Sequence, residues 1–61
     1  MKHKATATIT MPIEAVFEDD GEHPLIDQAD AALEAEAEWR YCLTPGEFKL
    51  DGLKTQPLGR G

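Results

Sequence analysis

A run of 35 residues without lysine or arginine is the feature that most constrains how this chain can fold. The run extends from residue 5 to residue 39 and contains ten aspartate or glutamate residues. Charge of one sign at this density resists compaction, so a folded domain must keep these carboxylates in water. The formal net charge is −6. Such a chain repels nucleic acid, and it should either bind something basic or use the charge only for solubility.

The size of the chain sets the second constraint. Sixty-one residues make one domain at most, and a chain of this length buries only about 60% of the surface that its unfolded form exposes. The only cysteine, Cys42, has no partner for an internal disulfide, which fits a reducing compartment. No apolar run approaches the roughly 18 residues of a transmembrane helix. We therefore expect a single α+β domain over residues 1–61, located in the cytoplasm and without a membrane partner.

The first third of the chain has the pattern of β-strand. Over residues 3–17 the odd positions are mainly small or apolar, whereas the even positions are mainly threonine and other polar residues. Alternation with period two predicts a sheet with one packed face and one face in water. Pro12 cannot donate to a strand ladder, so it predicts either a bend in one long strand or a break between two short strands.

Residues 18–23 read as an acidic loop around Gly21. An EF-hand calcium loop does not fit, because placing Gly21 at its sixth position puts Val16 at the first and Asp27 at the twelfth. His23, which lies beside carboxylates, is either a metal ligand or an exposed residue near a helix start, and we favour the second. The sequence predicts no metal site and no cofactor.

A helix is predicted over residues 24–43, which are rich in alanine, glutamate and leucine and contain no glycine. Pro24 suits the first turn, and Thr44 and Pro45 end the helix. At 100° per residue one side is apolar, and it comprises Leu25, Ala29, Ala32, Leu33, Trp39 and Leu43. Trp39 and Tyr41 could stack on a ligand, but we expect them to be packing residues, and we expect Cys42 to be a small core or boundary residue.

The rest of the chain is predicted from shorter signals. Glu36 falls within the apolar side of the helix, so we expect it to pair with Arg40 at the rim of the core. A turn at residues 44–47 and a short strand ending at residue 51 should follow the helix. Residues 52–61 are expected to be loose. In short, bent N-terminal strands should pack against one acidic amphipathic helix and a short C-terminal strand.

The opposite side of the helix carries an acidic stripe, which comprises Asp27, Asp30, Glu34 and Glu38. Like charges four residues apart each cost about 0.2–0.5 kcal/mol, and a helix built only for solubility usually alternates its signs. The stripe spans about 16 Å, a length over which one DNA strand carries about five phosphates. Neighbouring loop carboxylates extend this acidic surface, and they are Glu18, Asp19, Asp20 and Glu22. The alternative, a merely solvated acidic face, remains open.

Catalytic signals are weak. The chain has no serine, no asparagine and no glycine-rich phosphate loop, and 61 residues seldom enclose a pocket. A nucleophilic pair of Cys42 with a histidine is conceivable. However, Cys42 adjoins Tyr41 and Leu43, which favours a packing role for the thiol. Direct binding to DNA is disfavoured because the basic residues lie at the two ends without forming a patch. We therefore predict that the protein is not an enzyme.

With the acidic stripe and the loop residues Glu18, Asp19 and Asp20 in view, the chain resembles the small acidic anti-CRISPR proteins of phages that act on type I surveillance complexes. The resemblance rests on size, charge, the lack of cysteine pairs and the α+β pattern, since that class shares no sequence motif. It implies a non-enzymatic inhibitor in the host cytoplasm that binds a Cas subunit and blocks target DNA or nuclease recruitment. A monomer or weak homodimer would bind a basic nucleic-acid-binding protein through the acidic face.

Two other hypotheses follow from different features. A structural, assembly or antitoxin-like module would associate through a sheet edge or through the apolar face of the strand region, at Ile9, Ile13 and Phe17. A small metal-dependent enzyme would be centred on His23.

Overall fold

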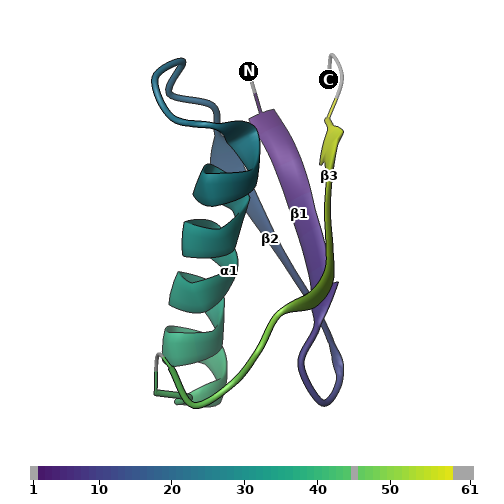
Figure 1. Cartoon of the computed structure of the whole chain (residues 1–61), viewed down its shortest axis with the longest axis vertical. Coiled ribbons are helices and arrows are strands. Elements are labelled where there is room, and N and C mark those ends of the chain that lie inside the picture. The colour runs from purple at the N-terminus through teal and green to yellow at the C-terminus, as the bar shows by residue number, and fades with distance from the viewer. Residues whose placement is uncertain (1, 45, 59–61) are drawn as a thin grey trace.

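One helix covers one face of a three-stranded antiparallel sheet, which confirms the small α+β domain (Figure 1). The computed structural model describes residues 2–44 and 46–58. Its elements, in chain order, are β1 (Lys2–Thr8), β2 (Pro12–Glu18), α1 (Leu25–Tyr41) and β3 (Asp51–Pro57). The strand order is β2-β1-β3, so β1 is central and both other strands are edges. Among the described residues, no helix is both long and apolar enough to cross a bilayer.

The predicted strand region is a β-hairpin with its break at residues 9–11. Pro12 begins β2, so of the two sequence alternatives the break between short strands is correct. The register pairs Ala7 with Ile13 and places every odd residue of β1 opposite an odd residue of β2. Opposed residues in an antiparallel pair share a face. The apolar sets of the two strands therefore combine into one surface, on which α1 packs.

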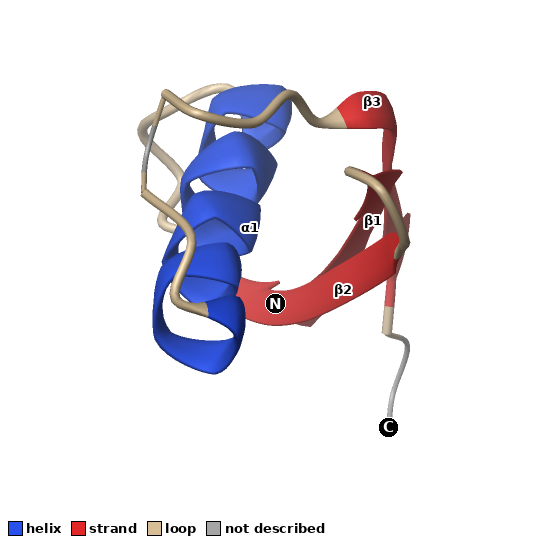
Figure 2. Cartoon of the chain, turned by 90° about the horizontal axis from the view of Figure 1, so that it is seen from below, coloured by secondary structure: helices blue, strands red, loops and turns tan. Residues whose placement is uncertain are grey.

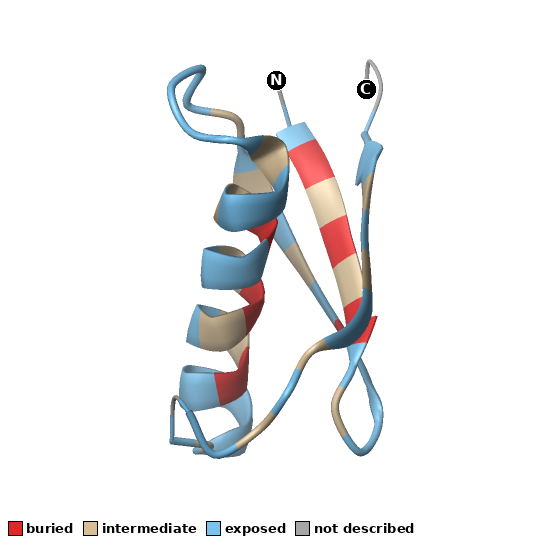
Figure 3. Cartoon of the chain, in the orientation of Figure 1, coloured by how far each residue is buried: buried red, intermediate tan, exposed pale blue. Residues whose placement is uncertain are grey.

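The core is made largely of alanine. Figure 3 shows the buried residues on β1 and on the side of α1 that faces it, and Figure 2 shows the helix and sheet as two separate layers. Leu33 is the largest fully buried side chain. The other buried apolar residues are Ala5, Ala7, Ile13, Ala29 and Ala37. Small residues on both layers let the helix lie close to the sheet, and half-buried side chains such as Phe17 and Phe48 close the margins.

The helix presents a different face to the sheet from the one predicted. The buried positions Ala29, Leu33 and Ala37 are centred about 70° around the axis from the predicted apolar side, at 100° per residue. Ala37 consequently belongs to the core. Trp39 is 71% exposed, so its assignment as a packing residue was wrong.

The helix also ends two residues earlier than predicted. Cys42 adopts a left-handed conformation with φ 56°, and the Leu43 N–H donates to the Ala37 carbonyl oxygen at 3.1 Å. The left-handed residue, together with this hydrogen bond to a carbonyl six residues back, ends the helix without a glycine. Cys42 is exposed, which contradicts its predicted role as a core or boundary residue. Leu43, beyond the helix end, packs half-buried against the core.

The third strand lies where a loose tail was predicted. β3 begins at Asp51, and the expected strand positions Phe48 and Leu50 belong instead to the segment that leads to it. One extra residue of β3 lies between the pairs Thr6–Lys54 and Thr8–Asp51, and Gly52 has φ 65° at this bulge. Before it, the Glu47 N–H donates to the Thr44 carbonyl oxygen at 3.0 Å, as in the predicted turn. Pro45 and residues 59–61, which were part of the predicted turn and tail, lie outside the described residues.

Truncating Leu33 should remove most of the stability of this small core. Leu33→Ala is expected to cost about 2–5 kcal/mol, which is comparable with the whole free energy of unfolding of a domain this size. Urea unfolding followed by circular dichroism measures the loss. Val16→Ala, at a residue that is 57% exposed, is the control and should change stability little. Equal stability of both variants would contradict this assignment of the core.

Candidate acidic interface

The structure brings the acidic stripe together on one flank of α1. Asp27, Asp30 and Glu38 are exposed, and Glu34 is half-buried. Because the buried face is rotated, the stripe lies about 100° from its centre rather than directly opposite, at 100° per residue. The first two stripe residues border a shallow depression of about 360 Å³, lined also by Ile26, Lys49, Leu50, Asp51 and Leu53. The stripe therefore adjoins the segment that enters β3.

Electrostatic repulsion within the stripe is visible at Glu34. The pKa of Glu34 is raised above its usual 4.5, first by the negative charge of Asp30, then by partial loss of water, by a hydrogen bond with Asp30 and by the charge of Glu38. Three successive carboxylates of α1 thus interact as a row. Neighbouring negative charges disfavour the ionised form of a carboxyl group, which accounts for the direction of the shift at Glu34.

The ion pairs found among residues 2–44 and 46–58 lie away from the stripe. Lys4 pairs with Glu14 at 2.8 Å on the sheet, and the ring of His23 meets Asp20 at 2.8 Å in the loop. Arg40 pairs with Glu36, which confirms the predicted contact. None of these ion pairs includes a residue of the stripe, and Lys49 is the cation of the described residues that borders the same depression.

Two of the loop carboxylates serve the loop itself. Asp20 accepts hydrogen bonds from the backbone N–H groups of Glu22 at 2.8 Å and of His23 at 3.1 Å. The Glu22 N–H, the His23 ring and the His23 N–H, in that order, lower the pKa of Asp20 to about 2. Asp19 accepts from the Gly21 N–H at 2.9 Å. These two carboxylates are committed to local structure, unlike those of the stripe.

Gln28 connects the loop to the helix, a role that was not predicted. Its side-chain Oε1 accepts from the Asp20 N–H at 3.0 Å, while Nε2 donates to Asp19 Oδ1 at 2.9 Å and to the His23 carbonyl oxygen at 2.8 Å. The signal available in the sequence was the position of Gln28 in the first helical turn, directly after an acidic loop. Only the folded loop brings all three partners within reach.

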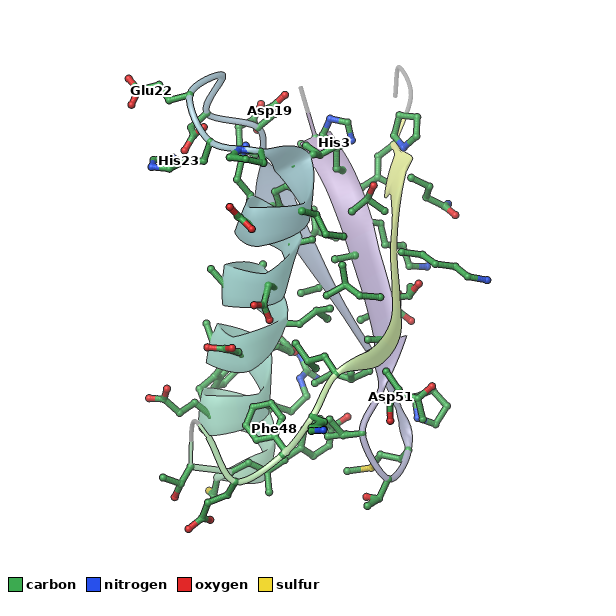
Figure 4. The ribbon with its side chains drawn as sticks, viewed as in Figure 1. His3, Asp19, Glu22, His23, Phe48 and Asp51 are labelled. Carbon is green, nitrogen blue, oxygen red and sulfur yellow. The ribbon has the colours of Figure 1, made fainter. Side chains whose placement is uncertain are left out.

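The remaining loop residues are directed outward. Figure 4 shows the side chains of Glu22 and His23 pointing away from the body of the domain, whereas Asp19 lies against the start of α1. Glu18 is exposed at the end of β2. His23 is exposed, as favoured from the sequence, and Asp20 raises its pKa by a hydrogen bond and by its charge.

No cluster of three or more histidine, cysteine, aspartate or glutamate side chains within the described ranges could hold a metal ion. The described residues also form no pair of Cys42 with His23. Cys42 lies at the end of α1 remote from the loop that carries His23 (Figure 1).

His3 is buried, only 8% exposed, with its ring stacked on Phe17 at 5.7 Å between centroids. The stacking with Phe17 explains His3 as a packing residue.

No protein-family model, curated protein or solved structure matches this chain.

Replacing Glu34 should stabilise the fold. Glu34→Gln removes repulsion from Asp30 and Glu38 and should raise the free energy of unfolding at pH 7 by a few tenths of a kcal/mol. In the parent, the raised pKa means that the folded state binds more protons just above pH 4.5, so this repulsion is relieved as the pH falls. The difference between variant and parent should therefore shrink towards pH 4.5. Urea unfolding at both pH values measures it, and lower stability of Glu34→Gln at pH 7 would contradict the assigned repulsion.

The Asp20–His23 pair predicts a titration. The pKa of His23, followed by NMR, should lie above 6.5 in the parent and fall towards 6.5 in Asp20→Asn, because the variant removes the carboxylate charge. Since the folded-state pKa is raised, the stabilisation by this pair is present below pH 6.5 and is lost as the pH rises through the folded pKa. Glu22→Gln is the control and should leave the titration unchanged. An unshifted His23 in the parent would rule out the pair in solution.

Proposed function

We propose that this chain is a non-enzymatic inhibitor that presents its acidic stripe to a basic nucleic-acid-binding site on another protein. The observation that carries the proposal is the raised pKa of Glu34 between two like charges, on a helix flank that no ion pair of the described residues neutralises. A cationic partner would supply the missing counter-charge and relieve the repulsion.

The free energy of the acidic stripe differs between the free protein and a complex. In the free protein each like-charged pair four residues apart destabilises α1 by about 0.2–0.5 kcal/mol. In a complex the same carboxylates meet lysine or arginine side chains, and the cost becomes attraction. Long-range attraction of this kind speeds association and makes it sensitive to salt. The protein would thus occupy a site whose usual ligand is the phosphate backbone.

The resemblance to anti-CRISPR proteins selects the first partner to test. A subunit of a type I surveillance complex offers a basic channel for DNA, and the inhibitor would act on it in the host cytoplasm. The proposal needs neither a cofactor nor contact with nucleic acid. Glu22 would extend the contact from the loop, whereas Asp19 and Asp20 would shape it.

Assembly through a sheet edge is the alternative function. Association through the apolar strand face is the less favoured form of assembly, because Ile13 is buried and Ile9 and Phe17 pack against the core under α1. β2 and β3 are the edge strands of the described sheet, so each has one side that pairs with no other described strand. Pro12 and Glu14 on β2 are of the types that oppose edge-to-edge pairing. The acidic surface is therefore the better supported interface.

The test is affinity capture with the immobilised protein from lysate of bacteria that carry a type I system, followed by competition with duplex DNA. The expected result is a basic nucleic-acid-binding protein that salt releases and that DNA displaces. Asp30→Asn combined with Glu34→Gln should weaken this binding roughly three- to tenfold at low salt, because two charge contacts at the surface are lost.

The matched control is Glu14→Gln combined with Glu47→Gln. This variant also removes two negative charges, but at positions outside the stripe. This variant should bind nearly as the parent does. Equal binding by both double variants, or simultaneous binding of DNA and this chain to the captured protein, would overturn the proposal.

A further inference from the structure

The single tryptophan of the chain is held in place while exposed to water. Trp39 is 71% exposed, the largest fraction among the exposed large hydrophobic residues. Its Nε1–H donates to Glu36 Oε1 at 3.3 Å, and the guanidinium carbon of Arg40 lies 5.5 Å from the ring centroid. Arg40 also pairs with Glu36. These contacts restrict the indole before any partner arrives, which lowers the entropic cost of binding through it.

Trp39 ends a flat row on the outer surface of α1. Residues four apart on a helix form a continuous row, and here Ala31 and Ala35 lead to Trp39. Both alanines are exposed. We call these three residues the alanine row. No described element covers it, since α1 contacts the sheet through Ala29, Leu33 and Ala37 on a different side.

A parallel row of carboxylates lies beside the alanine row. Asp30, Glu34 and Glu38 follow the same four-residue spacing, each one position before a member of the alanine row. Their positions along the axis recur about every 6 Å. An apolar row bordered by a charged row is the complement of a helix that has apolar residues on one side and lysine or arginine next to them.

We propose that the alanine row and Trp39 dock a cationic amphipathic α-helix of the partner. Apolar side chains of that helix would pack on the two alanines and against the indole, and its basic side chains would meet the acidic row. Small residues let two helices approach closely along their four-residue rows. Tryptophan is among the residue types that most often carry the binding energy of an interface. This proposal rests on the proposed function for its charge contacts. It adds that the partner presents an amphipathic α-helix to this surface.

A second copy of this chain does not fit the same surface. Pairing two copies through the alanine row would place the row of Asp30, Glu34 and Glu38 on each copy close to the carboxylates of the other. Like charges in such an arrangement repel, and Arg40, the one cation of α1, is already paired with Glu36. The charge pattern therefore selects a basic partner over self-association.

The test uses two synthetic 18-residue peptides of leucine and lysine with identical composition. One is ordered to form an amphipathic helix, and the other is scrambled so that it has no apolar face. The amphipathic peptide should bind more tightly at low salt and should shift the Trp39 emission to shorter wavelength as the ring leaves water. Trp39→Ala should weaken its binding, measured by anisotropy of labelled peptide, about tenfold or more. Val16→Ala, an exposed apolar residue on β2, is the control and should have no effect.

Ala35→Gln tests the close approach without changing charge. This variant keeps a good helix former at an exposed position. It should also weaken the binding of the amphipathic peptide, because the longer side chain keeps the two helices apart. Equal binding of the two peptides, absence of binding by both, or an unchanged affinity of Trp39→Ala would overturn the docking proposal. The combined Asp30→Asn and Glu34→Gln variant separates the two proposals. If this double variant weakens the binding of both peptides while Trp39→Ala weakens the binding of neither, the proposed acidic interface stands and the helix-docking proposal fails.

Discussion

Close packing of an alanine-lined helix on an alanine-lined strand is the interaction on which the rest of this structure depends. Ala29, Leu33 and Ala37 of α1 form one buried cluster with three residues of the sheet, which are Ala5, Ala7 and Ile13. Alanine loses no side-chain entropy on burial, and it lets the two layers approach closely enough for dispersion contacts along the whole interface. A chain of 61 residues without a disulfide can close a core in this way, although each contact contributes little.

That choice of core has a consequence for charge. Because α1 buries only one of its alanine-containing rows, its exposed surface includes alanines, carboxylates and Trp39. The carboxylates gain nothing from the core and repel one another, as the raised pKa of Glu34 indicates. In contrast, Asp19 and Asp20 are satisfied by loop N–H groups and by Gln28. The acidic segment therefore contains carboxylates that hold the loop in place and carboxylates that repel one another on α1.

The sequence pattern predicted the secondary structure of the first two thirds of the chain well, because the signals there are local. Period-two alternation identified β1 and β2, and alanine and glutamate content identified α1. The Glu36–Arg40 contact also followed from spacing alone. β3 could not be predicted, since residues 52–57 are mostly polar and form a strand through the ladder that the edge of β1 offers. The role of Gln28 likewise required three partners that only the folded loop assembles.

By itself the sequence determined that the chain has one helix, a strand pair with a single apolar face, and an acidic region that must stay in water. Each of these follows from composition and from residue spacing along one element. Only the tertiary structure decided the rotation of α1 about its own axis, and with it the exposure of Trp39 and the burial of Ala37. The physical reason is that an alanine-rich helix has several rows of nearly equal apolar area. The choice between them depends on how Leu33 and its neighbours fit the sheet, which no single element encodes.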